Sequence, residues 1–421
     1  MYFTALLKKP KEEFAHFLLL PHPTRVLLIT NMIYAFVLPV IEIFVGAYIM
    51  RSSNDPSIVV VYQLTVYTGI PITFCINGFL LNHIKISHLY SFGMLLSGLS
   101  MIVMMSLQNL SATGVGVAGL LMGCSFGFFW ANRDFLALNT TDDSTRNYYY
   151  GLETFFYTIT YIIVPVIVGA FLASTEINHW FEGSINTAYR IVTVIVFLLT
   201  IISSLVIHQG KFKNPEQKRF LFFKFHKLWK KMMVLAGLKG LAQGYLVTAP
   251  AILIMRLVGN EGSLGLVQGV SGVATAFMLY ILGRTMKPSD RIYIFATGLF
   301  IFLTGTLFNG ILFSAFGVMV FVLCKVLFTP LHDIAYFPTE MLVIDVVSKI
   351  EKRSEFAYIF NHEFGLYVGR FLGLVLFIVL AAYVSEIFAL KYALIIIALL
   401  QLAAIPVAAH IIKEANKLST P

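Results

Sequence analysis

The segment Gln209–Lys231, with the sequence QGKFKNPEQKRFLFFKFHKLWKK, decides the fold, because it is the one long polar stretch in a chain of 421 residues. Hydrophobic residues make up 58% of the chain and charged residues only 12%. Soluble globular proteins carry roughly 25% charged residues. So few charged side chains cannot cover the surface of a protein of this size in water. We therefore expect lipid to cover most of the protein.

Apolar runs long enough to cross a bilayer core of ~30 Å, which takes about 20 residues, lie on both sides of this segment. The sequence predicts an all-α membrane protein of twelve transmembrane helices in two six-helix bundles. The predicted parts are an N-terminal bundle (1–208), a cytoplasmic basic amphipathic linker (209–231) and a C-terminal bundle (232–421). The predicted spans are 26–49, 58–80, 90–108, 114–137, 148–173, 189–208, 232–256, 263–283, 292–308, 311–334, 355–381 and 388–412.

Positive charge sets the expected orientation. Most of the 30 Lys and Arg residues fall in the termini, the linker and the turns on the linker's side of the membrane. Since Lys and Arg mark cytoplasmic loops, we expect both termini in the cytoplasm and the chain in the bacterial cytoplasmic (inner) membrane. The net charge of +9 and the aromatic residues within the linker indicate contact with anionic lipid. We therefore expect membrane lipids as partners, no nucleic acid, and a monomer.

The two halves carry a weak repeat. Thr145–Glu153 (TRNYYYGLE) opens the fifth predicted span, and Lys352–Glu363 (KRSEFAYIFNHE) opens the eleventh. Each segment has a basic residue, then aromatic residues, then a glutamate inside the membrane. A repeat of six helices plus six is typical of secondary transporters.

With this topology the whole chain resembles the major facilitator superfamily. The turn Gly78–Lys85 (GFLLNHIK) is similar to the superfamily's loop motif, although Asn82 takes the place of its aspartate and the later glycine and arginines are missing. The run FFWANR at 128–133, followed by Thr145, Arg146 and the tyrosines, is similar to a little-characterised bacterial branch labelled YqgE-like. The resemblance implies that helices one, four, seven and ten line a central cavity and that three, six, nine and twelve face lipid.

Ionisable residues inside the predicted spans are the first candidates for function, since each costs ~2.5–3.5 kcal/mol on insertion scales. They fall on the first, fourth, fifth, seventh, tenth and eleventh spans. The third and ninth carry none, the sixth has only Arg190 at its outer edge, and the twelfth has only Lys391 near its outer end. This distribution avoids the helices that the resemblance places against lipid. It supports a polar central cavity.

We interpret these residues in three groups. The candidates for substrate binding are Glu42, Arg133, Lys239, Lys325 and Arg370. The candidates for proton coupling are Glu153 and Glu363, because burial of a carboxyl group without a full partner raises its pKa towards neutrality. The candidates for gating are Asn82, Lys85, Asp134, Arg146 and Asp333. Charges near the inner ends of helices, such as Arg133 and Asp134, could instead only reach towards the surface or form an inner-gate salt bridge.

Spacing on the eleventh helix gives two further expectations. Glu363 and Arg370 share one face, and their backbones are ~10 Å apart, so we expect each to pair with another helix or with substrate. His362 points to a different face, and we interpret it as a packed side chain.

Other motifs carry no chemistry. Gly114–Gly119 (GVGVAG) matches the dinucleotide fingerprint by letter, but it opens a predicted membrane span, where small residues favour helix packing. Cys75, Cys124 and Cys324 lie apart in apolar runs, and no phosphate-binding loop or nucleophile motif occurs. The sequence predicts no catalytic residue, no metal and no cofactor, and therefore no enzyme.

We expect a secondary active transporter that moves a small polar solute, anionic or zwitterionic, by alternating access with proton coupling. One alternative is a flippase for a lipid or lipid-linked glycan, which would need a lateral opening. The other is a membrane sensor or assembly partner that transports nothing. Buried charges on selected helices favour transport, because a scaffold has little reason to keep them.

Overall fold

The computed structural model of this chain describes residues 14–15, 17–141, 143–214, 222–286, 288–353 and 355–419. Within these ranges the regular structure is helical and no strand occurs. The long elements are α2 (His22–Tyr34), a π-helical turn (Val40–Phe44), α3 (Val45–Ser53), α4 (Pro56–Leu80), α5 (Ile86–Ser106), α6 (Ala112–Thr140), α7 (Asp143–Ile177), α8 (Ile185–Ile207), α9 (Lys227–Leu257), α10 (Glu261–Thr285), α11 (Arg291–Leu312), α12 (Ala315–Glu351), α13 (Glu355–Tyr383), α14 (Glu386–Gln401) and α15 (Ala404–Ser419).

The helices are long enough to cross a membrane. Eleven stretches of the described residues have the length and apolar composition of a membrane span, with α14 and α15 together forming the last. The shortest, α5, has 21 residues and a length of ~32 Å at 1.5 Å per residue. These helices support an integral membrane protein.

The first predicted span, 26–49, is not one helix, and the expectation of an unbroken helix there is wrong. Pro39 has no N–H to donate, and the chain passes from α2 through the π-helical turn before α3 begins. Glu42 lies in that turn. Such π turns inside helices occur frequently at functional sites, because they shift the direction of the side chains that follow.

The predicted end of the tenth span near residue 334 is also wrong. Helix α12 continues through Pro330 and Pro338 to Glu351. Prolines are tolerated in membrane helices when neighbouring groups satisfy the freed carbonyls. Asp333 therefore lies in the middle of a helix of 37 residues and not near its inner end.

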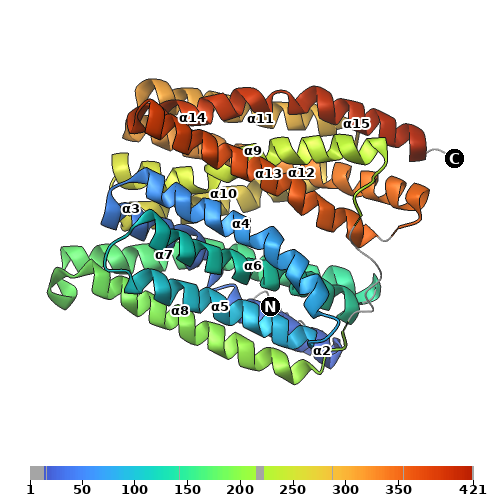
Figure 1. Cartoon of the computed structure of the whole chain (residues 1–421), viewed down its shortest axis with the longest axis horizontal. Helices are drawn as coiled ribbons and strands as arrows, with labels where there is room; N and C mark the ends of the chain where they lie inside the picture. The colour runs from blue at the N-terminus through green and yellow to red at the C-terminus, as the bar shows by residue number, and fades with distance from the viewer. Residues whose placement is uncertain are drawn as a thin grey trace, which may run out of the picture.

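The helices run roughly parallel along the longest axis of the molecule (Figure 1). Those before residue 210 gather on one side, and those after residue 227 gather on the other. The two groups meet where α4 packs against α13 and where α7 packs against α10. At the second contact a Cβ on Gly169 would lie 3.0 Å from the Cα atom of Gly265, so glycine on both helices is what allows the backbones to touch.

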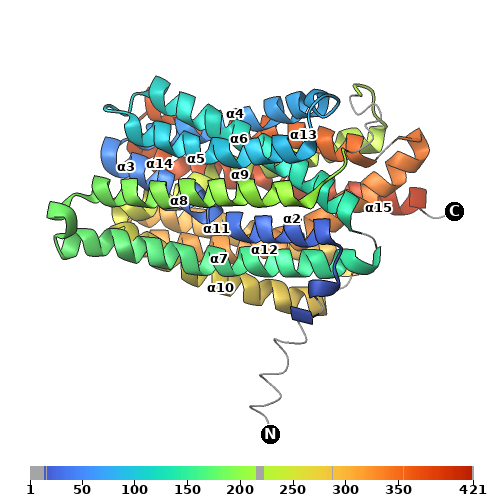
Figure 2. The same cartoon turned by 90° about the horizontal axis from the view of Figure 1, so that it is seen from below.

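Successive membrane spans run in alternate directions between two ends of the molecule, with α14 and α15 continuing in one direction (Figure 2). We call the end that carries residues 208–214 and 222–226 the linker end. Asn214 there binds the turn between α4 and α5: its Nδ2 donates to the carbonyl oxygens of Leu81 and Ile84 at 2.8 and 2.9 Å. Its Oδ1 accepts from the amide of Ile86 at 2.8 Å. On the other group of helices, Arg353 donates to the carbonyl oxygen of Lys224 at 2.6 Å. The two sides of the linker are thus tied to different halves.

Candidate functional site

A cavity of about 1200 Å³ lies between the two groups of helices. Its lining comes from the π-helical turn, α4, α6 and α7 on one side, and from α9, α12 and α13 on the other. Lining residues near the linker end include Tyr150, Ser348, Lys352 and Glu355, so the cavity extends to that end. It is therefore a polar and aromatic chamber between the halves.

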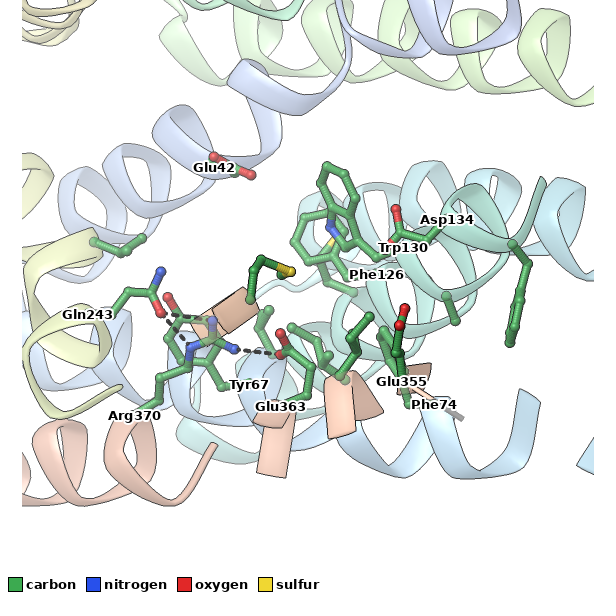
Figure 3. Close-up of a pocket in the computed structure, with 18 of the residues that line it drawn as sticks. Glu42, Tyr67, Phe74, Phe126, Trp130, Asp134, Gln243, Glu355, Glu363 and Arg370 are labelled. Atoms are coloured by element: carbon green, nitrogen blue, oxygen red, sulfur yellow. Dashed lines mark hydrogen bonds and ion pairs between the residues drawn. The ribbon is translucent and has the colours of Figure 1, made fainter. Parts of the chain in front are cut away.

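Arg370 of α13 is the centre of the charged wall (Figure 3). Its Nε and Nη2 both donate to Oε1 of Gln243 on α9, at 3.0 and 2.8 Å. Its guanidinium carbon lies 4.8 Å from the centroid of the Tyr67 ring on α4, a cation–π contact. Its Nη1 lies 3.4 Å from Oε2 of Glu363. The guanidinium is therefore aimed by a neutral amide and an aromatic ring, and only loosely held by a carboxylate.

The sequence predicted that Arg370 and Glu363 would each pair with another helix or with substrate. The short hydrogen bonds cross to α9 as expected, but Glu363 also reaches its helix neighbour two turns away, which the backbone spacing alone did not predict. A planar guanidinium presents a fork of donors that matches a carboxylate or phosphate group. The neutral amide of Gln243 takes two of these donors, and the Glu363 carboxylate lies 3.4 Å from a third.

Glu42 lies on the first-half side of the same cavity, apart from the arginine group (Figure 3). Phe126 and Trp130 of α6 form an aromatic wall beside it. Lys325 does not line this cavity. It lines a separate cavity of about 360 Å³, formed with Tyr161 of α7 and residues of α10.

Glu153 of α7 is held in a buried polar network of the first half. Arg133 donates to both of its oxygens, through Nε at 3.1 Å and through Nη2 in a second, short contact. Asn31 and Tyr149 donate to Oε1 at 2.6 and 3.0 Å. Four hydrogen bonds thus reach its two oxygens. Arg133 also pairs with Asp134 at 2.8 Å, so it brings the two acids together.

A second polar network lies in the other half. Lys239 of α9 binds Oδ1 of Asp333 on α12 at 3.0 Å. Nδ1 of His332 lies 3.1 Å from the same oxygen. The Lys239 ammonium also stands 4.0 Å from the centroid of the Tyr336 ring. The structure thus brings together Lys239 and Asp333, which sequence reasoning had assigned to different roles.

The same network continues to His362, which is hydrogen-bonded and not merely packed. Its Nε2 lies 2.6 Å from the Tyr336 hydroxyl, and its Nδ1 lies 3.1 Å from Oε1 of Glu340. Glu340 and His362 are 3% and 4% exposed. Sequence reasoning missed Glu340 because the predicted tenth span ended before it.

Arg51 and Glu261 close the end opposite to the linker, and we call this contact the outer lock. Nε and Nη2 of Arg51 on α3 bind both oxygens of Glu261 on α10, at 2.6 and 2.8 Å. Arg51 also reaches Glu176 of α7 at 3.0 Å, and Tyr189 of α8 donates to Glu261 at 3.0 Å. The Glu261 side chain is fully buried. The outer lock joins the two halves, and sequence reasoning missed it because both residues stand at helix ends.

The remaining predicted gating residues lie at the linker end. Asn82 and Lys85 are exposed in the turn between α4 and α5. The side chain of Arg146 lies outside what the structure describes. Among the residues that the structure describes, no group of three metal-ligating side chains occurs.

Comparison with known proteins gives relatives whose activity is not named. No protein-family model matches the chain. It is 21% identical over 374 residues to an uncharacterized protein, YqgE, of Bacillus subtilis, with 86% of this chain and 83% of the relative covered. It is 24% identical over 141 residues to an uncharacterized protein of Geobacillus stearothermophilus, which covers 34% of this chain and 66% of that protein.

Solved structures resemble the chain more fully. A nucleoside transporter, NupG, superposes with a TM-score of 0.66 at 14% identity and covers 93% of this chain and 99% of its own. A bacterial homologue of the iron transporter ferroportin, in an inward-facing state, gives 0.67 at 13%, covering 93% and 98%. The peptide-family transporter PepTSo gives 0.71 at 8%, covering 94% and 99%. These likenesses show a fold of the major facilitator type.

Proposed function

We propose that this protein is a secondary active transporter of the bacterial cytoplasmic membrane, with both termini in the cytoplasm, that moves a small polar solute by alternating access. The observation that carries the proposal is one cavity of about 1200 Å³ between the halves, which extends to the linker end while the outer lock joins the opposite end. A secondary transporter places its site between two repeats that rock against each other. In this proposal α2, the π-helical turn and α3 together form a twelfth span.

The cavity wall supports an anionic or zwitterionic substrate. Arg370 offers a fork of donors for a carboxylate or phosphate group, and Glu42 on the first-half side offers a site for a cationic group. Phe126 and Trp130 provide apolar surface between these charges. We assign substrate binding to Arg370 and Glu42, with Gln243 and Tyr67 as the groups that orient the guanidinium.

Proton coupling is the proposed energy source. Glu363 lines the cavity and is only loosely paired with Arg370, at 3.4 Å. Glu153, in contrast, accepts hydrogen bonds from four donors, so we propose that it stabilises the first half with Arg133. Asp134 lines the same cavity and remains a gating candidate.

A thermal-shift screen of carboxylates, phosphates and zwitterions, followed by uptake of each hit into vesicles with an imposed pH gradient, tests the proposal. Because a charge-assisted hydrogen bond contributes about 1.5–3 kcal/mol, Arg370→Gln should weaken binding of an anionic hit roughly 10- to 150-fold. Lys230→Gln, on the surface of α9, is the control and should leave binding unchanged. Uptake of the hits that is indifferent to the pH gradient and to Arg370→Gln would overturn the proposal.

A lipid flippase on the same scaffold is the second candidate, and the smaller cavity favours it. That cavity sets Lys325 beside the hydroxyl groups of Thr158, Ser271 and Thr275, between α7, α10 and α12. Such a wall suits an anionic headgroup, while the outer face of α10 exposes apolar residues such as Phe277 to lipid. Native mass spectrometry of the purified protein should then retain anionic lipid, and Lys325→Gln should remove it.

A further inference from the structure

Glu340 and His362 form a buried acid–imidazole pair that the proposed substrate site does not use. Both side chains are buried, on α12 and α13, and neither lines the main cavity. Both imidazole nitrogens have a polar neighbour: Nδ1 lies 3.1 Å from Oε1 of Glu340, and Nε2 lies 2.6 Å from the hydroxyl of Tyr336. From this geometry we infer that Glu340 and His362 together bind the coupling proton; the inference rests on the proposed function.

Glu340 and His362 can take up one proton while His362 keeps its contacts with Glu340 and Tyr336. With a neutral imidazole and an ionised Glu340, Nδ1–H faces the carboxylate oxygen at 3.1 Å and Nε2 accepts from the Tyr336 hydroxyl. A proton that arrives forms a new N–H bond at Nε2, which then donates to the Tyr336 oxygen as that hydroxyl group rotates. The Nδ1–H bond breaks as its proton passes to Glu340, so the pair ends as a neutral imidazole and a protonated carboxyl group. No bond between heavy atoms breaks. Imidazole is the side chain whose charge changes most readily near neutral pH.

The hydrogen-bond partners of Glu153, a buried acid of the first half, differ from those of Glu340. Arg133, Asn31 and Tyr149 direct four hydrogen bonds to its two oxygens. A proton on Glu153 would displace at least one of those donors and leave it buried without a partner. Glu340 faces an imidazole, which can itself give up or accept the proton.

The charges around the pair cancel, so with Glu340 ionised and His362 neutral the local net charge is −1, and one added proton brings it to zero. Lys239 of α9 is neutralised by Asp333, and Arg370 of α13 is neutralised in part by Glu363. The ionisable groups that face the pair from α9, α12 and α13 are Lys239, His332, Asp333, Tyr336, Glu363 and Arg370. The balance makes the pair sensitive to any single change of charge nearby.

Glu363 connects this pair to the substrate site, because it follows His362 directly on α13 and lies 3.4 Å from Arg370. An anionic substrate at Arg370 would compete with Glu363 for the guanidinium. The released carboxylate then adds uncompensated negative charge beside His362, which favours a proton on the pair. An anion and a proton would therefore bind cooperatively and move in the same direction.

The test needs no substrate, because the ligand is the proton itself. Infrared difference spectra of the purified protein in lipid nanodiscs should show the C=O stretching band of a buried protonated carboxyl group as the pH falls through neutrality. Glu340→Gln should remove this band, and His362→Gln should move its appearance to a different pH. The matched control is Glu414→Gln, since Glu414 also faces a histidine, His410, at 3.2 Å, but at the surface. The control should keep the band.

A second measurement covers the case in which a variant fails to fold. In wild-type protein with ¹⁵N-labelled histidine, solid-state NMR should show the N–H of the His362 ring move from Nδ1 to Nε2 over the same pH range. A band that persists in folded Glu340→Gln protein, or His362 signals that do not change with pH, would overturn the inference.

These outcomes separate the inference from the proposed function. A proton that titrates on the pair in a protein that moves no solute would overturn transport and leave the proton site standing. Uptake driven by a pH gradient that survives Glu340→Gln and His362→Gln at wild-type levels would leave transport standing and overturn the site.

Discussion

Replacing Arg51 by alanine should open the end of the molecule opposite to the linker. Glu261 is fully buried, and in the closed state it would keep only the hydroxyl of Tyr189 as a partner, at 3.0 Å. Removal of one partner from a buried ion pair costs about 3–5 kcal/mol. The cost applies only while the lock is closed, because water reaches Glu261 once the halves separate. At 1.4 kcal/mol per factor of ten, the equilibrium should shift roughly a hundred- to a few-thousandfold towards the opened state.

Glu261→Gln should shift the equilibrium much less. The Arg51 side chain that remains is 26% exposed and keeps Glu176 at 3.0 Å, so it is neither dry nor unpaired. The order of the two variants is therefore a sharper prediction than either magnitude. It follows from which partner is buried and which has a second contact.

Double electron–electron resonance measures the shift of this equilibrium as a change in the distance between two spin labels. Labels at Gln108 and Ala315, which are exposed at that end on different halves, should report a longer distance in Arg51→Ala than in the parent protein. The parent carries alanine at Cys75, Cys124 and Cys324. An unchanged distance distribution in a correctly folded Arg51→Ala protein, or a larger change in Glu261→Gln, would refute the reasoning.

Two further predictions concern stability. A Cβ on Gly369 of α13 would meet the backbone of Gly237 on α9, so Gly369→Ala should lower the melting temperature in detergent. A Cβ on Gly151 would have nothing within 4 Å, so Gly151→Ala is the control and should not lower it. Equal melting temperatures of the two variants would contradict the packing argument. Asn77 and Asn132 exchange amide hydrogen bonds at 3.1 and 2.7 Å. Asn132→Leu should therefore cost about 1–3 kcal/mol of unfolding free energy by leaving Asn77 unpaired, and adding Asn77→Leu should recover most of it; a double variant no more stable than the single one would contradict this.

The sequence predicted where the helices lie but not how two of them are interrupted. Apolar length locates a membrane span well, because every backbone group there must be bonded within a helix. It carries no information on the π-helical turn at Glu42, which depends on how the chain passes Pro39 against its neighbours. It also placed the end of the tenth span near residue 334, just after Asp333, since charge and proline resemble a helix end when the neighbouring helices are unknown.

Of the five residues predicted to bind substrate, Glu42 and Arg370 line the main cavity, and Arg133, Lys239 and Lys325 do not. Arg370 and Glu42 stand out in the sequence as charges in apolar surroundings, and both line the main cavity. Gln243, which holds Arg370, is neutral and does not stand out. Which charge meets which depends on the rotation and depth of separate helices, and no periodicity within one helix specifies that. The same limit applies to the outer lock and to Glu340.

The two ties of the linker set a limit on how far the molecule can move. Asn214 binds the first half, and the backbone of Lys224 is bound by Arg353 of the second. Nine residues lie between these points, and the ten steps from Cα to Cα would reach at most ~33–36 Å when fully stretched. While both contacts hold, the length of chain between them limits how far the two halves can separate at this end. Lengthening it with inserted residues would relax this mechanical stop and leave every residue of the cavity in place.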